Sequence, residues 1–174
     1  HYHATAQKSK NTADYQEAVK WYRAYLGAFP KDPDAAKSNF LLAELLFEDS
    51  RFAEAVVEYE KSAYDYPAHD KSADAGYSAL LSYAAQEKRA AAGDVVALQK
   101  AGVESSLRFA QAFPQDARVA TVLTNAAEKL FALRDDARAA TVAQQVLALE
   151  PPPVPAQRRL AWTIIAHTSY DTGA

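Results

Sequence analysis

The sequence predicts an all-α protein in which antiparallel helix pairs stack side by side as a solenoid of about nine helices. The first observation behind this fold is a recurring pattern in which an aromatic residue, a small residue and a tyrosine precede a closing proline. The closing prolines stand at 30, 67, 114 and 151, so the steps between them are 37, 47 and 37 residues. A period in this range, filled with helix-forming residues, indicates stacked helical hairpins.

Apolar spacing and composition are the second and third observations. Leu42, Leu45 and Leu46 share one helix face, and no segment alternates between apolar and polar residues over a useful length, so no strands are expected. Apolar residues make up 49% of the 174-residue chain, which supplies a continuous core, and only five residues are glycine. The abundant alanines favour helices and let them approach closely.

Capping residues and breakers place each helix in turn. A first helix holds Tyr2 and Ala6, and Asp14 is expected to cap the second. Pro33 and Asp34 open the third helix. The expected helices after the first cover 14–29, 35–49, 51–66, 70–89, 94–113, 116–133, 135–149 and 155–170.

The later boundaries follow from the same signals. Either Asp70 or Ser72 starts the fifth helix, and Gly93 with Asp94 separates it from the sixth. Asp116 opens the seventh helix, and Asp135 or Asp136 opens the eighth. Three consecutive prolines at 151–153 break the chain, and Pro155 fits the first turn of the last helix.

The 47-residue step holds ten more residues than the 37-residue steps, and they fall between Gln86 and Gln99. We expect them to lengthen both helices of that hairpin by about five residues, or roughly 7 Å each. Such a projection is either a tolerated variation in length or a specialised docking edge.

Composition excludes several classes of function. The chain has no cysteine, which rules out disulfides, thiolate catalysis and Cys-ligated metals. The net charge of −3 argues against broad nucleic-acid binding. No signal peptide is visible, no segment is long and apolar enough to insert in a membrane, and the start at His1 suggests a processed or excised chain.

These residues resemble the tetratricopeptide repeat (TPR) family, whose fold is a right-handed superhelix of helix pairs. The second copy matches the family pattern best, through Leu42, Ala43, Leu46, Phe52, Ala55, Tyr59 and Pro67. The first copy matches through Tyr2, Ala6, Tyr15, Ala18, Tyr22 and Pro30. The fourth copy is weaker because Asp136 replaces the turn aromatic, and the third departs most because it carries the insertion.

The resemblance implies a single solenoid segment over 1–174 with about four and a half repeats, at 1–30, 34–67, 71–114, 116–151 and 155–174. Both ends fall inside helices, so we expect a piece of a longer repeat protein, with self-association through the cut ends as a possibility. The Phe-Pro and Tyr-Pro closures are similar to bacterial cell-envelope members, the outer-membrane assembly lipoproteins and Tol-Pal coordinator proteins. That similarity implies a periplasmic or outer-membrane-associated location, although the composition fits the cytoplasm almost as well.

No constellation of catalytic residues, cofactor motif or metal-ligand motif is found in the sequence. His1 and His3 are interpreted as terminal polar residues or a tag remnant, and His69 as a solvent-facing loop residue. His167 is expected to line a groove wall or an interface. We therefore expect no enzyme activity, no cofactor and no bound metal.

Glu44 and Glu48 lie four residues apart and share a helix face, which suits a solvated or a peptide-binding acidic surface. In the TPR family the first helix of each repeat lines the inner curve of the superhelix. That resemblance implies a peptide-binding face made of Lys37, Phe40, Glu44, Phe47, Glu48, Asp74, Tyr77, Leu81, Thr124, Glu128, Phe131, His167 and Tyr170. The competing interpretation is that adjoining repeats cover part of this face.

The function expected from these features is a non-catalytic scaffold that binds protein or peptide partners along its concave face, in bacterial envelope assembly. Apolar pockets would anchor the partner, and the carboxylates would favour its basic side chains. One alternative is the positioning or substrate-binding superhelix of a larger enzyme whose catalytic domain lies outside this segment. A second alternative is a structural spacer or self-association module.

Overall fold

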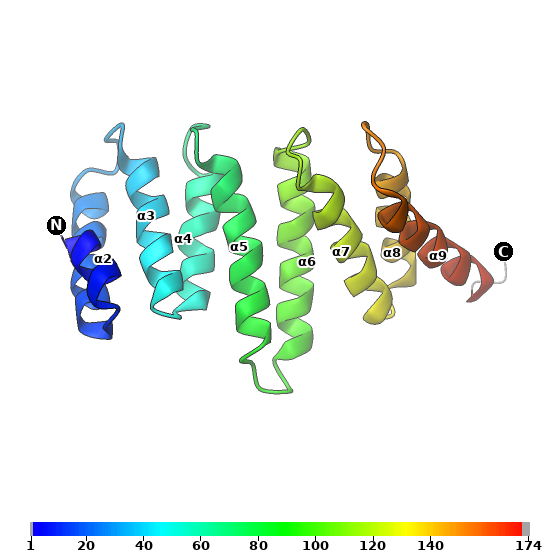
Figure 1. The fold of residues 1–174 in the computed structure, drawn as a ribbon, viewed down its shortest axis with the longest axis horizontal. Coiled ribbons are helices and arrows are strands. Elements are labelled where there is room, and N and C mark those ends of the chain that lie inside the picture. Colours follow the sequence, from blue (N-terminus) through cyan, green and yellow to red (C-terminus); the bar gives the residue numbers. More distant parts are fainter. Residues whose placement is uncertain (1, 172–174) are drawn as a thin grey trace. The chain divides into compact units, whose positions relative to one another are not determined.

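The computed structural model describes residues 2–171, and over that range the chain is all-helical (Figure 1). Nine α-helices and no strands are present among these residues, which confirms the predicted fold class. The helices are α1 (Tyr2–Ser9), α2 (Thr12–Ala28), α3 (Ala35–Glu48), α4 (Phe52–Tyr64), α5 (Ser72–Glu87), α6 (Val95–Ala112), α7 (Val119–Ala132), α8 (Asp136–Leu147) and α9 (Pro155–Asp171).

The chain divides into two compact units, His1–Ala90 and Ala91–Ala174. In unit 1 each helix from α1 to α5 packs against the next, and α1 also touches α3. In unit 2 each helix from α6 to α9 packs against the next, and α9 also packs against α7. Within each unit the connections alternate between the two ends of the helices, so neighbouring helices run antiparallel (Figure 1). This is a helical-repeat-like, all-α architecture.

Small residues at the helix contacts let the backbones of unit 1 approach closely. Ala18, Ala43, Ala55 and Ala79 are fully buried, with 0% of their surface exposed. Larger apolar side chains fill the space between the helices, and burying one of them fully contributes about 1.5–3 kcal/mol. The most buried of these in unit 1 are Leu42, Leu45, Leu46 and Tyr59. The apolar residues that recur with helical spacing in the sequence therefore lie on the helix faces that form this core.

Unit 2 has its own core. Phe109 of α6 is fully buried, and Arg118 lies 5.7 Å from the centre of its ring. Apolar side chains from the other three helices complete this core, among them Val122, Leu130, Val146 and Ile164. Each unit thus has the buried apolar centre that a stable packing of helices requires.

The turns inside two of the hairpins have the same backbone geometry, 84 residues apart. Ser50 between α3 and α4 has φ of 62°, and Arg134 between α7 and α8 has φ of 61°. The next residue in each turn donates its N–H five residues back, from Arg51 to Leu46 O at 2.8 Å and from Asp135 to Leu130 O at 3.0 Å. The offset of 84 equals the 37- and 47-residue steps added together, so the recurrence seen in the sequence is also a recurrence of backbone hydrogen bonds.

The loops that follow α2 and α6 repeat each other with the same offset. Phe29 and Phe113 end these helices with φ of −130° and −126°. Each donates its N–H four residues back, at 2.8 Å and 2.9 Å. Asp32 and Asp116 then donate to the carbonyl oxygens of those phenylalanines, at 3.2 Å and 2.9 Å. The two Phe-Pro closures therefore mark one recurrent type of helix end.

The helix starts agree with the prediction only in part. Helix α2 begins at Thr12, and its cap is Asn11, whose side chain accepts the N–H of Asp14 at 2.9 Å, so Asp14 is not the cap. Asp135 caps α8 by accepting the N–H of Arg138 at 3.4 Å. Asp94 precedes α6, but its side chain makes no capping bond.

The ten additional residues of the third copy are shared unequally between its helices and loop. Helix α6 has 18 residues where α4 has 13, so it gains the predicted five. Helix α5 has 16 residues where α3 has 14, so it gains two. The connection between α5 and α6, at 88–94, is also longer than the one between α3 and α4, at 49–51. No helix in the described part of the chain is long and apolar enough to cross a membrane.

Candidate functional site

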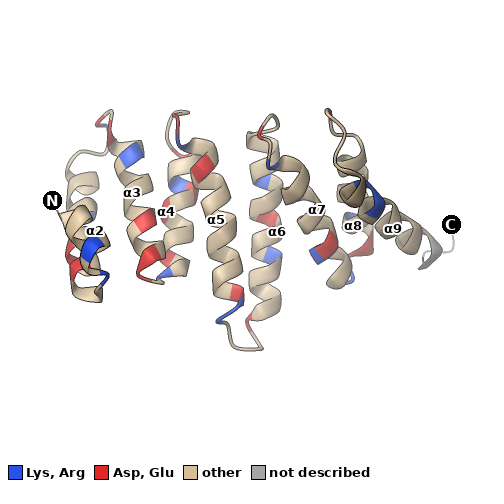
Figure 2. Ribbon diagram, in the orientation of Figure 1, with Lys and Arg blue, Asp and Glu red and all other residues tan. Residues whose placement is uncertain are grey.

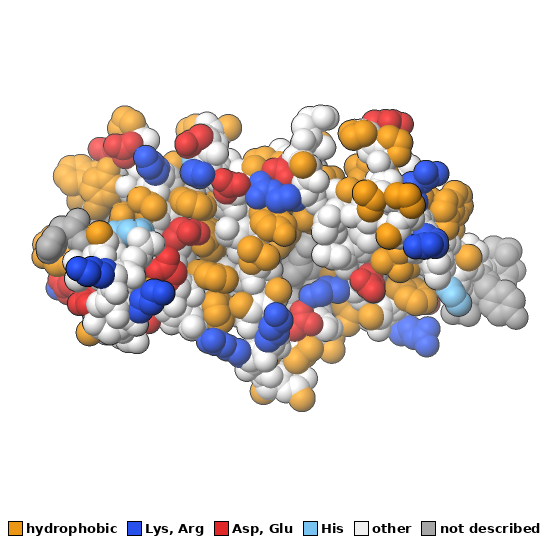
Figure 3. Space-filling model, in the orientation of Figure 1, with side chains coloured by type: hydrophobic (Ala, Val, Ile, Leu, Met, Phe, Trp, Pro, Cys, Tyr) orange, Lys and Arg blue, Asp and Glu red, His pale blue; other side chains and the backbone are white. Residues whose placement is uncertain are grey.

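The candidate site lies in unit 1, on the surface of α3 and α5, the two helices that flank α4 (Figure 1). We define the α3–α5 surface by six of the sequence-predicted site residues: Phe40, Glu44, Phe47 and Glu48 of α3 with Tyr77 and Leu81 of α5. Glu44 and Glu48 lie one turn apart on α3, which separates them by about 6 Å along the helix axis. Acidic side chains lie beside hydrophobic ones on the near face of this unit (Figure 3).

Glu48 is exposed, and two neighbouring helices fix its carboxylate. Tyr15 of α2 donates its hydroxyl to Glu48 Oε2 at 2.9 Å. Gln7 of α1 donates from Nε2 to Glu48 Oε1 at 2.9 Å. Tyr15 is only 5% exposed, and its burial, followed by its hydrogen bond to Glu48, raises the pKa of its hydroxyl above the ordinary value. The tyrosine therefore remains a donor, and the carboxylate keeps one orientation.

The carboxylate of Glu44 is also oriented by a tyrosine, which comes from α4. Tyr59 of α4 is 2% exposed and donates its hydroxyl to Glu44 Oε1. Burial and then this hydrogen bond raise the pKa of Tyr59, while the side chain of Ser78 on α5 also bonds to its hydroxyl. The ring of Phe40 lies 5.8 Å from the ring of Tyr59. Tyr59 of α4 thus links α3 to α5 by hydrogen bonds beneath the α3–α5 surface.

Neither Glu44 nor Glu48 forms an ion pair with any residue that the structure describes. Glu54 of α4 shows the contrast, because Arg51 and Arg23 both reach its carboxylate at 2.7 Å. Hydrogen bonds from those arginines lower the pKa of Glu54 to about 2. The α3–α5 surface therefore presents two negative charges that no cation among residues 2–171 neutralises.

The same two helices carry apolar and aromatic groups that are at least partly exposed. Leu81 is 46% exposed, whereas Phe40, Phe47 and Tyr77 are half-buried. Phe47 packs on Phe52 at 5.1 Å between ring centres, so part of its surface serves the fold. The surface can accept hydrogen bonds from a cation and can also contact an apolar side chain.

The other two predicted residues of unit 1 lie outside this arrangement. Lys37 is exposed on the first turn of α3, seven residues before Glu44. Asp74 accepts an ion pair from Lys71 at 3.1 Å, so its charge is already partnered. Figure 2 shows basic and acidic residues at separate heights along α3.

The predicted residues of unit 2 form a less open surface. Thr124 is only 6% exposed and donates its hydroxyl to Ala120 O at 2.7 Å, so it does not present a free polar group. Glu128 is exposed, and the ring of Phe131 lies 6.0 Å from that of the exposed His167. The side chain of Tyr170 lies outside the described part of the structure.

Two surface cavities were missed by the sequence reasoning. One of about 360 Å³ lies in unit 1 among α1, α2 and α3, and its wall includes Trp21, which stacks on Tyr2 at 5.4 Å and is 49% exposed. One of about 440 Å³ lies in unit 2 among α6, α7 and α8, with Leu107 and Val142 in its lining. In the sequence, the presence of a tryptophan at position 21 could have indicated the first cavity.

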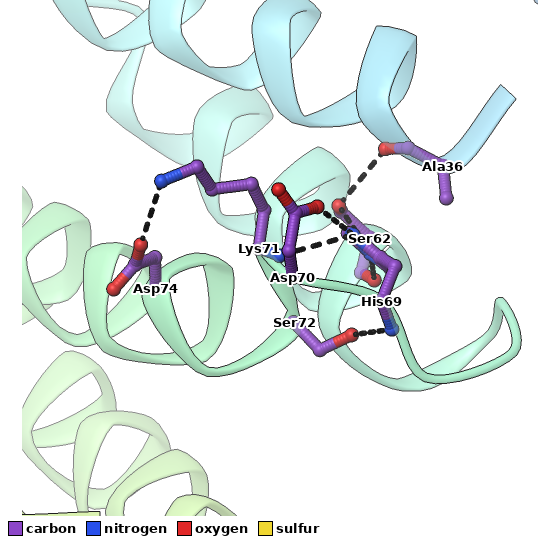
Figure 4. A network of polar contacts seen from close by, with 7 residues as sticks. All are labelled: Ala36, Ser62, His69, Asp70, Lys71, Ser72 and Asp74. Atoms are coloured by element: carbon purple, nitrogen blue, oxygen red, sulfur yellow. Dashed lines mark hydrogen bonds and ion pairs between the residues drawn. The ribbon is translucent and has the colours of Figure 1, made fainter. Parts of the chain in front are cut away.

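The prediction that His69 faces solvent is wrong, because its side chain belongs to a polar network between α4 and α5 (Figure 4). Its side chain is 16% exposed. Its Nε2 donates to Ser62 O at 2.9 Å, and its backbone N–H donates to Ser72 Oγ at 2.9 Å. Ser62 in turn donates to Ala36 O at 3.1 Å, so the network joins α3, α4 and the start of α5. Its role is structural.

His3 is the histidine that the structure places near the N-terminus. His3 contacts the hydroxyl of Tyr22 at 3.3 Å through Nδ1, which makes it a packing residue more than a free terminal one. His1 lies outside the described residues. Among residues 2–171, no group of three histidine or acidic side chains is placed to hold a metal ion.

Comparisons with known proteins leave the family open. No protein-family model matches the chain, and no curated protein matches it. The class that the structure itself defines is an all-α protein of consecutive, helical-repeat-like hairpins.

Proposed function

We propose that this chain is a non-catalytic scaffold of the TPR type that binds a protein or peptide partner through the α3–α5 surface. The observation that carries the proposal is the pair of carboxylates, Glu44 and Glu48, that tyrosine hydroxyls orient and no cation neutralises in the described structure. The half-exposed Leu81 supplies an apolar contact beside them. The residues that orient these carboxylates reduce the conformational-entropy cost of binding, because the side chains are already ordered before the partner binds.

The recurrent turns support the assignment to a repeat class. The α3–α4 and α7–α8 turns share their hydrogen bonds, and both follow a helix with an alanine at the close contact, Ala43 or Ala127. Helical repeats of this kind present extended surfaces that bind segments of other proteins. A peptide partner is therefore the expected ligand class.

We place this scaffold in the bacterial cell envelope on the resemblance of its closures, Phe29-Pro30, Tyr66-Pro67 and Phe113-Pro114, to envelope members of the TPR family. Fractionation of the source cells with an antibody against the chain tests the location. Recovery in the cytosolic fraction alone would contradict this part of the proposal.

The binding function is tested by selecting a displayed library of random peptides against the purified chain. We expect enriched peptides whose affinity falls at least about tenfold in the double variant Glu44→Lys, Leu81→Ala, because both the charge and an apolar contact change. Leu81 is exposed and Glu44 is partly exposed, so the variant is expected to keep the far-ultraviolet circular dichroism of the parent. Glu17→Lys on α2 is the matched charge control. No enrichment, or enriched peptides that bind parent and double variant equally, would refute the proposal.

A further inference from the structure

We infer that the partner of the α3–α5 surface is a short extended segment with two basic side chains, separated by one residue, that bind Glu44 and Glu48. This inference rests on the proposed function and adds the chemistry and spacing of the ligand. Three features of the surface support it: the distance between the carboxylates, the lack of a counterion for them in the described part of the chain, and the exposed apolar group on α5.

The distance between the carboxylates matches an extended chain. Four residues of α3 separate Glu44 from Glu48, which is about 6 Å along the axis. In an extended segment, side chains two residues apart point the same way and lie about 6.6 Å apart, whereas adjacent side chains point to opposite sides. A segment that lies along α3 therefore brings its residues i and i+2 to the two carboxylates. A segment of this length is too short to form a stable helix by itself, which favours the extended conformation.

The charges of the surface favour a basic ligand. The neutral donors occupy Oε1 of Glu44 and both oxygens of Glu48, and they leave the negative charge in place. Each carboxylate oxygen can accept a second hydrogen bond, so both groups can still bind a cation. Lysine or arginine side chains would add charge-assisted hydrogen bonds to the same groups. An acidic segment would meet like charges in both positions and be disfavoured.

The apolar contact comes from the equivalent position of the next helix pair. Leu81 of α5 occupies the position that Glu44 has in the preceding repeat, 37 residues earlier, and it is 46% exposed. Tyr59 and Ser78 connect the two helices at this level. An apolar residue beside the basic pair would therefore contact Leu81 while the cations reach α3.

The test uses three labelled peptides of matched length. The probe is acetyl-Leu-Lys-Ser-Lys-Leu-amide, the spacing control is acetyl-Leu-Lys-Lys-Ser-Leu-amide, and the charge control is acetyl-Leu-Asp-Ser-Asp-Leu-amide. Fluorescence anisotropy with the full chain measures the affinity of each peptide. We expect the probe to bind most tightly, the spacing control at least about threefold more weakly, and the charge control most weakly. Raising the salt concentration should weaken the probe most, because screening acts on charged pairs.

Neutral variants connect the affinity to the two carboxylates. Glu44→Gln and Glu48→Gln keep an acceptor for the tyrosine hydroxyls, and each is expected to weaken the probe by about threefold to tenfold. Glu17→Gln, which keeps its acceptor for Trp21, should leave the affinity unchanged. The double variant Glu44→Lys, Glu48→Lys should instead prefer the acidic peptide. Equal melting temperatures of parent and glutamine variants show that the fold is retained.

The inference falls if the probe does not bind, if both lysine peptides bind equally, or if Glu17→Gln weakens the probe as much as Glu44→Gln. Its failure is distinguishable from failure of the proposed function. Library peptides that enrich without basic residues and still depend on Leu81 would keep the scaffold proposal and refute the basic ligand. A library that yields no binder to the chain refutes both.

Discussion

Replacing Glu54 by glutamine tests how the ion-pair cluster on α2 and α4 contributes to stability. Arg51 donates from Nε and Nη2 to the two carboxylate oxygens of Glu54 at 2.7 Å and 2.8 Å. Arg23 reaches the same carboxylate from α2 at 2.7 Å. The substitution removes the charge but keeps the size and an acceptor oxygen.

The magnitude follows from the pKa of Glu54, which hydrogen bonds from Arg51 and Arg23 lower from 4.5 to about 2. A shift of this size corresponds to about 3.4 kcal/mol at 1.36 kcal/mol per unit. The side chains of Glu54 and Arg23 are 43% and 45% exposed, so solvent screening reduces the contribution to about 0.5–1 kcal/mol. Because the folded pKa is the lower one, this stabilisation is present above about pH 4.5 and is lost as the pH falls towards 2.

Urea unfolding followed by circular dichroism measures the effect in parent and Glu54→Gln proteins at pH 7, 4 and 2.5. We expect the parent to be more stable by about 0.5–1 kcal/mol at pH 7, with the difference shrinking as the pH falls. Glu17 forms a longer ion pair, with Lys20 at 3.6 Å, so Glu17→Gln should change stability little at any of these pH values. Equal stability at pH 7, or a difference that persists at pH 2.5, would refute the reasoning.

Four further substitutions test the packing and the turns by thermal or urea unfolding. Tyr59→Phe removes a buried donor from Glu44 and should destabilise by about 1 kcal/mol. Asn39→Ala should cost about 1–3 kcal/mol, because Asn39 is fully buried and its amide donates to a backbone carbonyl of α4 at 2.7 Å. Ala43→Leu should cost about 1–3 kcal/mol by overpacking a site with 0% exposure. Ser50→Gly should stabilise by about 0.5–1 kcal/mol, because glycine adopts its φ of 62° without strain.

Each of these expectations has an outcome that contradicts it. An unchanged midpoint for Tyr59→Phe or Asn39→Ala would show that these hydrogen bonds contribute nothing net. Tolerance of leucine at Ala43 would mean that α3 does not approach its neighbours closely. A loss of stability in Ser50→Gly would remove the argument from backbone strain, and Arg134→Gly repeats that measurement in unit 2.

The hairpin pattern was accessible from the sequence because it depends on local signals with a fixed spacing. The closures at Phe29-Pro30 and Phe113-Pro114 do end helices in the same way, and the last helix does begin at Pro155. The cap at Asn11 was missed because Asp14 has equal local propensity, and only the backbone path decides between them. The handedness of a superhelix stays a prediction.

The candidate site was predictable only in part. Helical spacing correctly put Glu44 and Glu48 on one accessible face, since side chains four residues apart share a face. Their donors, Tyr59 and Tyr15, stand 15 and 33 residues away, so no local pattern indicates them. Thr124 was assigned to the surface by repeat position, but α9 packs on α7 as well as on α8, and a single repeat does not show which positions a later helix covers.

Ser50 and Arg134, two of the three non-glycine residues with positive φ in the described chain, have a consequence for how such chains diverge. Neither is the glycine that this conformation prefers, yet the main chain follows the same route in both places. Mutation can therefore change the residue types in a turn while the backbone conformation of the turn is retained. Kinship among proteins built in this way is better traced by superimposing their corners than by aligning their residues.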